Sequence, residues 1–190
     1  MDVHTWIGND LDSVRTKLRD SVLSVVPARR WVEQVDSGGS SLAHLVLHVA
    51  RHHDLAITTA IRNHQPLFDA HREALGLGDA PPSVALAERE NPAVSAVLPA
   101  ESLVEYFAAV FDATTAWLGE VGTLMLDTVP ETSRRLTRKA GLGVDDVDWL
   151  HRMWADKPTW WLLQWPVIGH GHAHVGEAIS VRNRMGLSPF

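Results

Sequence analysis

The feature that most constrains this chain is an apolar period of three to four residues, repeated over several long stretches. The first stretch covers about residues 5–26 and stops at Pro27. Such a stripe is typical of an amphipathic α-helix, which must bury its apolar side against other elements. Residues 41–63 and 102–121 repeat the pattern. The apolar positions of the first stretch are Ile7, Leu11, Val14, Leu18, Val22 and Val25.

A fourth stretch near the end of the chain carries a proline in its interior. We predict that this helix starts near Pro158, kinks or restarts at Pro166 and ends before Gly186. The chain of 190 residues is long enough to bury one sizeable core, so we expect a single all-α domain over residues 1–190. Four long helices indicate a four-helix bundle, an architecture in which facing helices build metal sites.

Two long connections separate these helices, one between helices 2 and 3 and one between helices 3 and 4. Residues 64–100 are interrupted by Gly and Pro, and we expect one short helix there. A connection of this length is usually a lid, a wall of a site or a crossover. Residues 122–157 are expected to hold short helices near 127–139 and 144–154. We interpret one basic run there as solvated charge: Arg134, Arg135, Arg138 and Lys139.

The composition excludes several classes of function. Because the chain contains no cysteine, any metal must be held by nitrogen and oxygen, and a reactive sulfur must come from a cosubstrate. The net charge is −6 and the basic residues are scattered, which argues against nucleic acid as a partner. We find no signal peptide and no apolar run long enough for a membrane span, and we therefore expect a cytoplasmic protein with no membrane partner.

Histidine is the unusual residue, with 11 in the chain. His170 and His174 lie four residues apart and Glu177 follows three residues later, so on a helix the three side chains share one face. Two imidazoles on neighbouring turns are well placed to hold a divalent metal ion. His172 falls on the opposite side of such a helix, and we expect it at solvent or at an interface.

A third ligand is expected from the second helix. His44, His48 and His52 lie at four-residue steps along or beside its apolar side. His48 takes a mid-helix position that an apolar residue would otherwise fill. We predict a site of His48, His170 and His174 that leaves a coordination position open. His44 could reach the edge of this site, whereas we expect His52 to pack or to donate to a carbonyl group.

Two further features bear on the site. Glu177 could approach the metal or act as a base toward a bound water, or it could orient His48 or cap a neighbouring helix. We favour a supporting role, because imidazole ligands need an acceptor for their second N–H. The Trp-rich segment 149–165 is expected mainly in the core or at a homodimer face. One or two of its rings could wall a pocket over the metal, which would suit an apolar or aromatic substrate.

Two segments of the chain resemble the DinB-like superfamily. Residues 40–50 resemble its W-S-x-x-E-x-x-x-H-x-A signature, and residues 170–177 resemble its terminal H-x-x-x-H-x-G-E/Q. The resemblance implies an up-down-down-up four-helix bundle with a three-histidine site. The implied ligands are His48, His170 and His174, with zinc or nickel as the first candidates and iron, cobalt or copper as further ones. The chain departs from the signatures at Ser40, His44 and Val175, positions that bear on subfamily and substrate.

The same resemblance implies a function. The superfamily includes bacillithiol transferases and mycothiol-dependent maleylpyruvate isomerases, so we expect a metal-dependent transferase or isomerase whose small-molecule partner is mycothiol or bacillithiol. A bound cation would favour a thiolate or hydroxide near neutral pH. A rival hypothesis is a non-catalytic helical module that binds a metal or a hydrophobic ligand in stress response. A third is a dimer scaffold whose histidines are vestigial.

Overall fold

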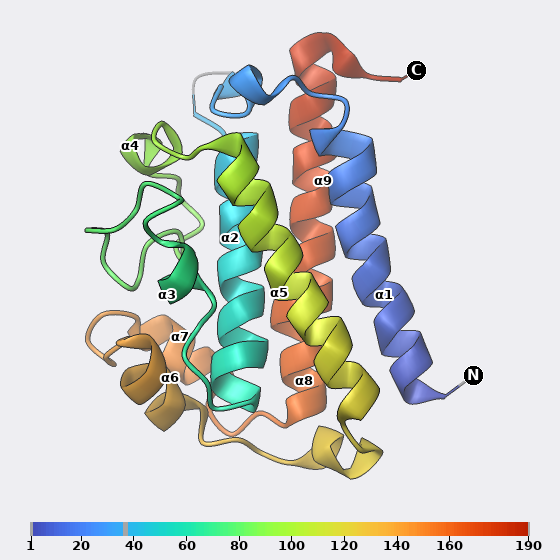
Figure 1. Ribbon diagram of the computed structural model, residues 1–190, viewed down its shortest axis with the longest axis vertical. Coiled ribbons are helices and arrows are strands. Elements are labelled where there is room, and N and C mark those ends of the chain that lie inside the picture. The colour runs from blue at the N-terminus through green and yellow to red at the C-terminus, as the bar shows by residue number, and fades with distance from the viewer. Residues whose placement is uncertain (1, 36–37, 190) are drawn as a thin grey trace.

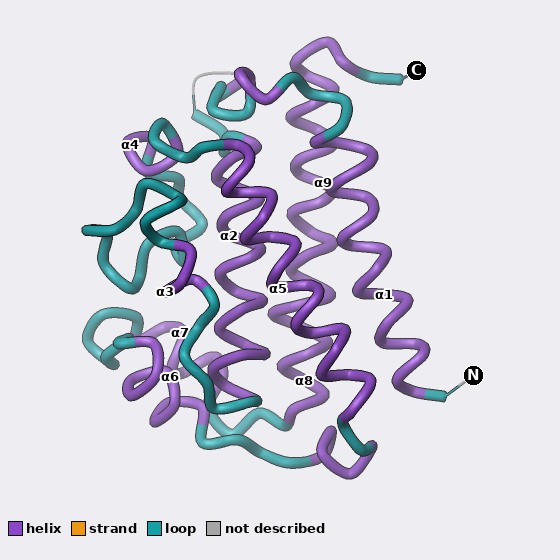
Figure 2. The backbone as a smooth tube through the Cα atoms, in the orientation of Figure 1, coloured by secondary structure: helices purple, strands orange, loops and turns teal. Residues whose placement is uncertain are grey.

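The computed structural model describes residues 2–35 and 38–189, and every regular element within them is a helix (Figures 1 and 2). The predicted all-α fold is therefore confirmed. The longest α-helices lie side by side, and α2 packs against α5 and α9, while α1 packs against the same two helices. Their bounds are α1 (Val3–Leu18), α2 (Leu42–Asp54), α5 (Ala100–Glu120) and α9 (His170–Arg182).

Several of these helices continue into π-helical turns. Pro166 lies in such a stretch, between α8 (Thr159–Leu163) and α9. Proline has no N–H to donate within a helix, and a wider turn accommodates the missing bond. The interruption expected at Pro166 is therefore confirmed, and Gly186, with a φ of 78°, lies at the end of the segment. The π-helical stretches are η1 (Arg19–Leu23), η4 (Leu55–Ile61), η6 (Gln164–Gly169) and η7 (Asn183–Leu187).

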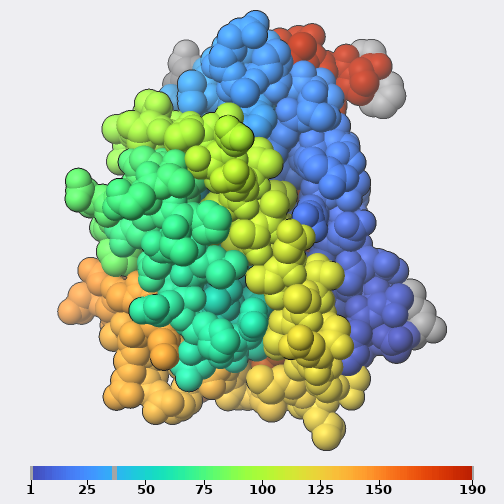
Figure 3. All heavy atoms as spheres, viewed as in Figure 1, coloured from blue at the N-terminus to red at the C-terminus, as the bar shows by residue number. Residues whose placement is uncertain are grey.

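Short helices occupy the two long connections. The connection after α2 and η4 holds two of them, α3 and α4, rather than the one expected. In the second connection α6 packs against η4 and against α7. These segments form the outer surface on the α2 side of the molecule (Figure 3). Their bounds are α3 (Phe68–His71), α4 (Pro92–Ser95), η5 (Thr123–Asp127), α6 (Thr132–Ala140) and α7 (Asp148–Trp154); η2 (Ala28–Arg30) precedes α2.

α2 is buried along its whole length, although it contains several polar residues. Residues 81–91, here called the covering loop, lie over its polar side. Since buried polar groups need hydrogen-bond partners, this side of α2 donates to main-chain carbonyl groups of the loop. The contacts are Arg51 Nη2 to Pro82 O (2.5 Å), His48 Nδ1 to Ala85 O (2.8 Å) and His52 Nε2 to Leu86 O (3.1 Å).

Hydrogen bonds at Ser41 fix one end of this arrangement. Ser41 is the N-cap of α2, and its hydroxyl accepts the N–H of His44 at 3.2 Å, as its position before the apolar run suggests. The Glu90 carboxylate accepts the main-chain N–H and the hydroxyl of Ser41. The covering loop is thus tied to the start of α2. Among the described residues, none of the helices combines the length and apolar character needed to cross a membrane.

Candidate metal centre

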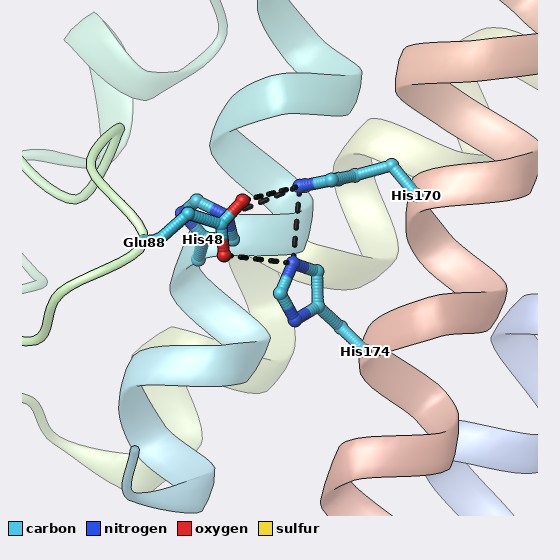
Figure 4. Close-up of side chains that lie close together, drawn as sticks. All are labelled: His48, Glu88, His170 and His174. Atoms are coloured by element: carbon cyan, nitrogen blue, oxygen red, sulfur yellow. Dashed lines mark hydrogen bonds and ion pairs between the residues drawn. The ribbon is translucent and has the colours of Figure 1, made fainter. Parts of the chain in front are cut away.

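Three histidines from two helices converge where α2 meets α9. His48 comes from α2, and His170 and His174 come from the first two turns of α9. The Nε2 atom of His170 lies 3.1 Å from Nε2 of His48 and 3.1 Å from Nε2 of His174 (Figure 4). The structure therefore brings together the three residues predicted as ligands, while metal binding by them stays a prediction.

A carboxylate from the covering loop completes this cluster. Glu88 oxygens lie 3.8, 3.9 and 3.6 Å from Nε2 of His48, His170 and His174, and the four candidate ligand atoms all lie within 4.8 Å of one another. The Glu88 side chain is 76% exposed, so it forms the outer side of the cluster (Figure 4). No motif in the sequence indicates Glu88. Its only signal was that a long connection often supplies a wall of a site.

Hydrogen bonds on the far side of two rings determine which nitrogen carries the proton. Nδ1 of His48 donates to the Ala85 carbonyl at 2.8 Å, and Nδ1 of His174 donates to Glu177 Oε2 at 2.9 Å. A carbonyl or an ionised carboxylate can only accept, so each of these rings in its neutral form holds its proton on Nδ1. Their Nε2 lone pairs therefore point at the centre of the cluster.

Burial keeps the rings of His48 and His170 uncharged near neutral pH. Desolvation is the main cause that lowers the pKa of His48 to about 4 and that of His170 to about 3. The hydrogen bond from His174 is the main cause that lowers the pKa of Glu177. Metal ligands have to be neutral imidazoles or ionised carboxylates. His48 and His170 are therefore in their metal-binding protonation state at neutral pH.

The donor set fits a divalent ion. Three imidazole nitrogens and a carboxylate oxygen suit zinc and other first-row metals. Two nitrogens bound to one tetrahedral zinc lie about 3.3 Å apart, close to the 3.1 Å seen between adjacent Nε2 atoms. His170 has at most one Nε2 proton when neutral, so only one of its two short contacts can be a hydrogen bond. Nδ1 of His170 is buried without a partner among the described residues.

Gly171 lies where α9 packs closely against α1. A Cβ at Gly171 would lie 2.8 Å from Cγ1 of Val14 in α1, a distance that real Cβ atoms do not show. The absence of a Cβ at this position therefore permits the close approach of α9 to α1. α9 also packs against α2, where His170 and His174 meet His48.

The remaining residues singled out from sequence surround the cluster. Glu177 orients His174, whereas the interpretation that it orients His48 is wrong. His44 is buried, stacks on the His48 ring at 5.5 Å and lies outside the four-residue cluster. His52 contacts the Leu86 carbonyl, as expected for a packed donor, and its ring lies 4.6 Å from those of His48 and His170.

The Trp-rich segment divides into three environments. Trp154 is fully buried in the core. Trp149 is 38% exposed and its ring lies 5.9 Å from that of His52. His52 in turn contacts His48, so Trp149 is separated from the cluster by the His52 ring. Trp160 and Trp165 are about half exposed. His172, expected at solvent or an interface, is partly buried, and desolvation is the main cause that lowers its pKa.

A cavity of about 410 Å³ lies beside the cluster, with Glu88 and Glu177 in its wall. Its other lining residues are mostly polar or small, unlike the apolar, aromatic pocket that the tryptophans suggested. This volume lies in the range of small-molecule sites. The remaining lining residues are Gln34, Gly38, Gly39, Ser40, Arg89, Glu90 and Pro92.

Comparison with known proteins supports the fold. No family model matches the chain, and no curated protein matches it. Among solved structures, the chain is similar to a protein described as "Crystal structure of the conserved protein of locus from Enterococcus faecalis". The TM-score is 0.71 at 20% identity, over 98% of this chain and 99% of that one. At this identity the similarity shows a shared fold and nothing about function.

Proposed function

We propose that this chain holds a divalent metal ion between α2 and α9, with His48, His170 and His174 as ligands and Glu88 as a fourth donor. The observation that carries the proposal is the convergence of imidazole Nε2 atoms whose lone pairs are directed inward by acceptors on their Nδ1 side. Zinc and nickel are the first candidates, and iron, cobalt and copper also suit three nitrogens.

We further propose that the long helices form an up-down-down-up four-helix bundle of the DinB-like kind. Two observations support this assignment: the signatures at residues 40–50 and 170–177, and the ring of contacts in which α1 and α2 each pack against α5 and α9. The Enterococcus faecalis protein supports the overall fold and carries no argument about activity.

The proposed activity is a transferase or isomerase reaction with a low-molecular-weight thiol, mycothiol or bacillithiol, as cosubstrate. A bound metal would supply Lewis acidity that favours the deprotonated form of a thiol or of water. Glu177 would hold the His174 ring in place. Glu88, at the exposed side of the cluster, would accept the proton of an incoming thiol. The polar cavity beside them would take the hydrophilic part of the cosubstrate.

One observation favours the non-catalytic alternative, a bundle that binds a metal or a hydrophobic ligand in stress response. Metal sites with structural roles are closed by four protein ligands, whereas catalytic sites keep a position open. With Glu88 as a fourth donor the cluster would be closed. The enzyme proposal therefore requires that an incoming molecule displaces this exposed carboxylate, or that Glu88 stays outside the coordination sphere.

Metal analysis of protein purified without a histidine tag tests the site. We expect about one equivalent of zinc or nickel after reconstitution, and loss of it in His48→Ala and His170→Ala. His172→Ala is the matched control, because this histidine lies on the same helix outside the cluster. Well under one equivalent in the wild-type protein, or retention by His170→Ala, would overturn the metal proposal.

A thiol-conjugation assay separates the enzyme from the binding module. The protein is given mycothiol or bacillithiol and an electrophile, with and without a chelator. An enzyme loses its rate when the metal is removed and in His170→Ala, while His172→Ala stays active. A rate that the chelator leaves unchanged contradicts metal-dependent catalysis. A homodimer, suggested by the exposed tryptophans, stays a prediction for sedimentation analysis.

A further inference from the structure

α6 concentrates positive charge in a chain that is otherwise acidic. The chain has a net charge of −6, yet four of its 17 Lys and Arg residues lie within residues 134–139. On a helix these positions fall on one side, at spacings of one, four and five residues. The sequence alone predicts solvated charge at these positions. The structure instead places all four around one cavity of about 280 Å³: Arg134, Arg135, Arg138 and Lys139, with Asn63 as the fifth lining residue.

Arg135 is held firmly at this cavity. Its Nη1 donates to the carbonyl groups of Ala60 and Ile61, each at 2.8 Å, at the end of η4. These two bonds fix the guanidinium group, and its Nε is buried without a partner among the described residues. Arg135 therefore holds its positive charge at a fixed position beside the cavity.

The positive charges around the cavity are mostly uncompensated. Arg134 pairs with Glu131, one turn earlier. Arg138 and Lys139 are exposed and make no ion pair within residues 2–35 and 38–189. The lining contains no acidic side chain. Like charges at this spacing repel one another, and a bound anion would relieve the repulsion.

We propose that this cavity binds a small ligand carrying an oxyanion, either a phosphate or a carboxylate group. Arginine presents donors in a planar fork that matches both groups, and lysine adds a point charge. A cavity of about 280 Å³ lies at the small end of ligand sites, which favours a compact molecule. α6 has nine residues and is only about 13 Å long, and the rest of the chain is acidic, so extended polyanions find little complementary surface.

This anion site is separate from the candidate metal centre. His48 and Ile61 lie on one continuous helical segment, α2 followed by η4, and are on the order of 20 Å apart along it. Neither site supplies a lining residue to the other. Anion binding at α6 is therefore independent of whether the chain binds a metal.

NMR titration of chelator-treated protein tests the proposal. Inorganic phosphate, pyrophosphate and citrate are added at constant ionic strength, because salt screens weak charge interactions. We expect saturable shifts of backbone amides in α6 and near Asn63. The double variant Arg138→Gln/Lys139→Gln should weaken binding about tenfold or more, since it removes two charge-assisted contacts. Both side chains are exposed, so the fold should be unaffected.

Arg29→Gln/Arg152→Gln removes the same charge elsewhere and should bind as the wild type does. Preference for phosphate or for citrate identifies the anion class, and either result supports the site. Shifts that do not saturate, or equal weakening in both double variants, overturn it. Binding only to vesicles of phosphatidylglycerol and phosphatidylcholine, with none of the small anions, overturns it as well.

Discussion

His174 donates a hydrogen bond from Nδ1 to Glu177 Oε2 over 2.9 Å, within one turn of α9. The bond holds the Nε2 lone pair of His174 toward His170. It also lowers the pKa of Glu177, so the carboxylate is ionised and accepts this proton at neutral pH. Glu177 therefore acts on the cluster through the His174 ring.

Replacing Glu177 by alanine is expected to weaken metal binding about 10- to 100-fold, because the acceptor that orients a ligand imidazole is lost. Glu177→Gln keeps an oxygen acceptor, so its metal affinity should lie between that of Glu177→Ala and that of the wild type. Competition with a chromophoric chelator measures the affinity. Glu120→Ala, an exposed carboxylate at the end of α5, serves as control. Equal affinity of Glu177→Ala and wild type would contradict this role.

Glu88 offers a test of the fourth donor. Glu88→Ala should lower the affinity for cobalt and change the visible absorption of the cobalt form, which reports coordination number. Because the side chain is 76% exposed, the free energy of unfolding of the metal-free protein should change by less than about 0.5 kcal/mol. Glu105→Ala is the matched exposed control. An unchanged cobalt spectrum would place Glu88 outside the coordination sphere.

The contact between α9 and α1 predicts a packing effect. Gly171→Ala should destabilise the protein by about 1–3 kcal/mol, because its Cβ would overlap Val14. Gly176→Ala in the same helix meets nothing within 4 Å and should stabilise it by about 0.5–1 kcal/mol through helix propensity. Chemical denaturation measures both. In the double variant Val14→Ala/Gly171→Ala the overlap is relieved, so the loss of stability should be smaller than the sum of the losses in the two single variants. A loss equal to or larger than that sum would refute the overlap.

His53 predicts a pH dependence of stability. Thr114 Oγ1 donates to the Val110 carbonyl, so it accepts from Nε2 of His53, and the unprotonated Nδ1 is buried without a partner among the described residues. Burial lowers the pKa of His53 to about 3. Below the ordinary pKa of about 6.5, His53 is protonated in the unfolded chain but stays neutral in the folded chain. The free energy of unfolding therefore falls as the pH falls.

Between pH 6.5 and 3, His53 is expected to lower the free energy of unfolding by up to about 1.4 kcal/mol per pH unit. His53→Gln retains a donor for Thr114 and does not titrate, so its unfolding free energy should fall less steeply with acid. His64→Gln, at an exposed position, should follow the wild type. The measurement uses chelator-treated protein at several pH values. Parallel curves for His53→Gln and wild type would show that His53 does not contribute.

The sequence by itself determined the helices and one half of the site. Apolar spacing placed the four long helices to within a few residues, and Pro166 marked an interruption. The spacing of His170, His174 and Glu177 put them on one face, because contacts within a helix follow from residue number alone. The third histidine could be predicted only by pairing two segments that lie far apart in the sequence. His48 was selected from a stripe with His44 and His52, and the structure brings His48 to the two histidines of α9.

Only the tertiary structure decided what lies between helices. Glu88 joins the histidines because the covering loop folds back over α2, a consequence of carbonyl groups satisfying buried donors such as Arg51. The basic residues of α6 share a cavity because α6 packs on η4. Such contacts depend on the summed packing and hydrogen bonding of many residues, which no local pattern encodes. The local periodicity of the sequence thus specified the helices. Long-range packing specified which side chains of different helices and loops contact one another.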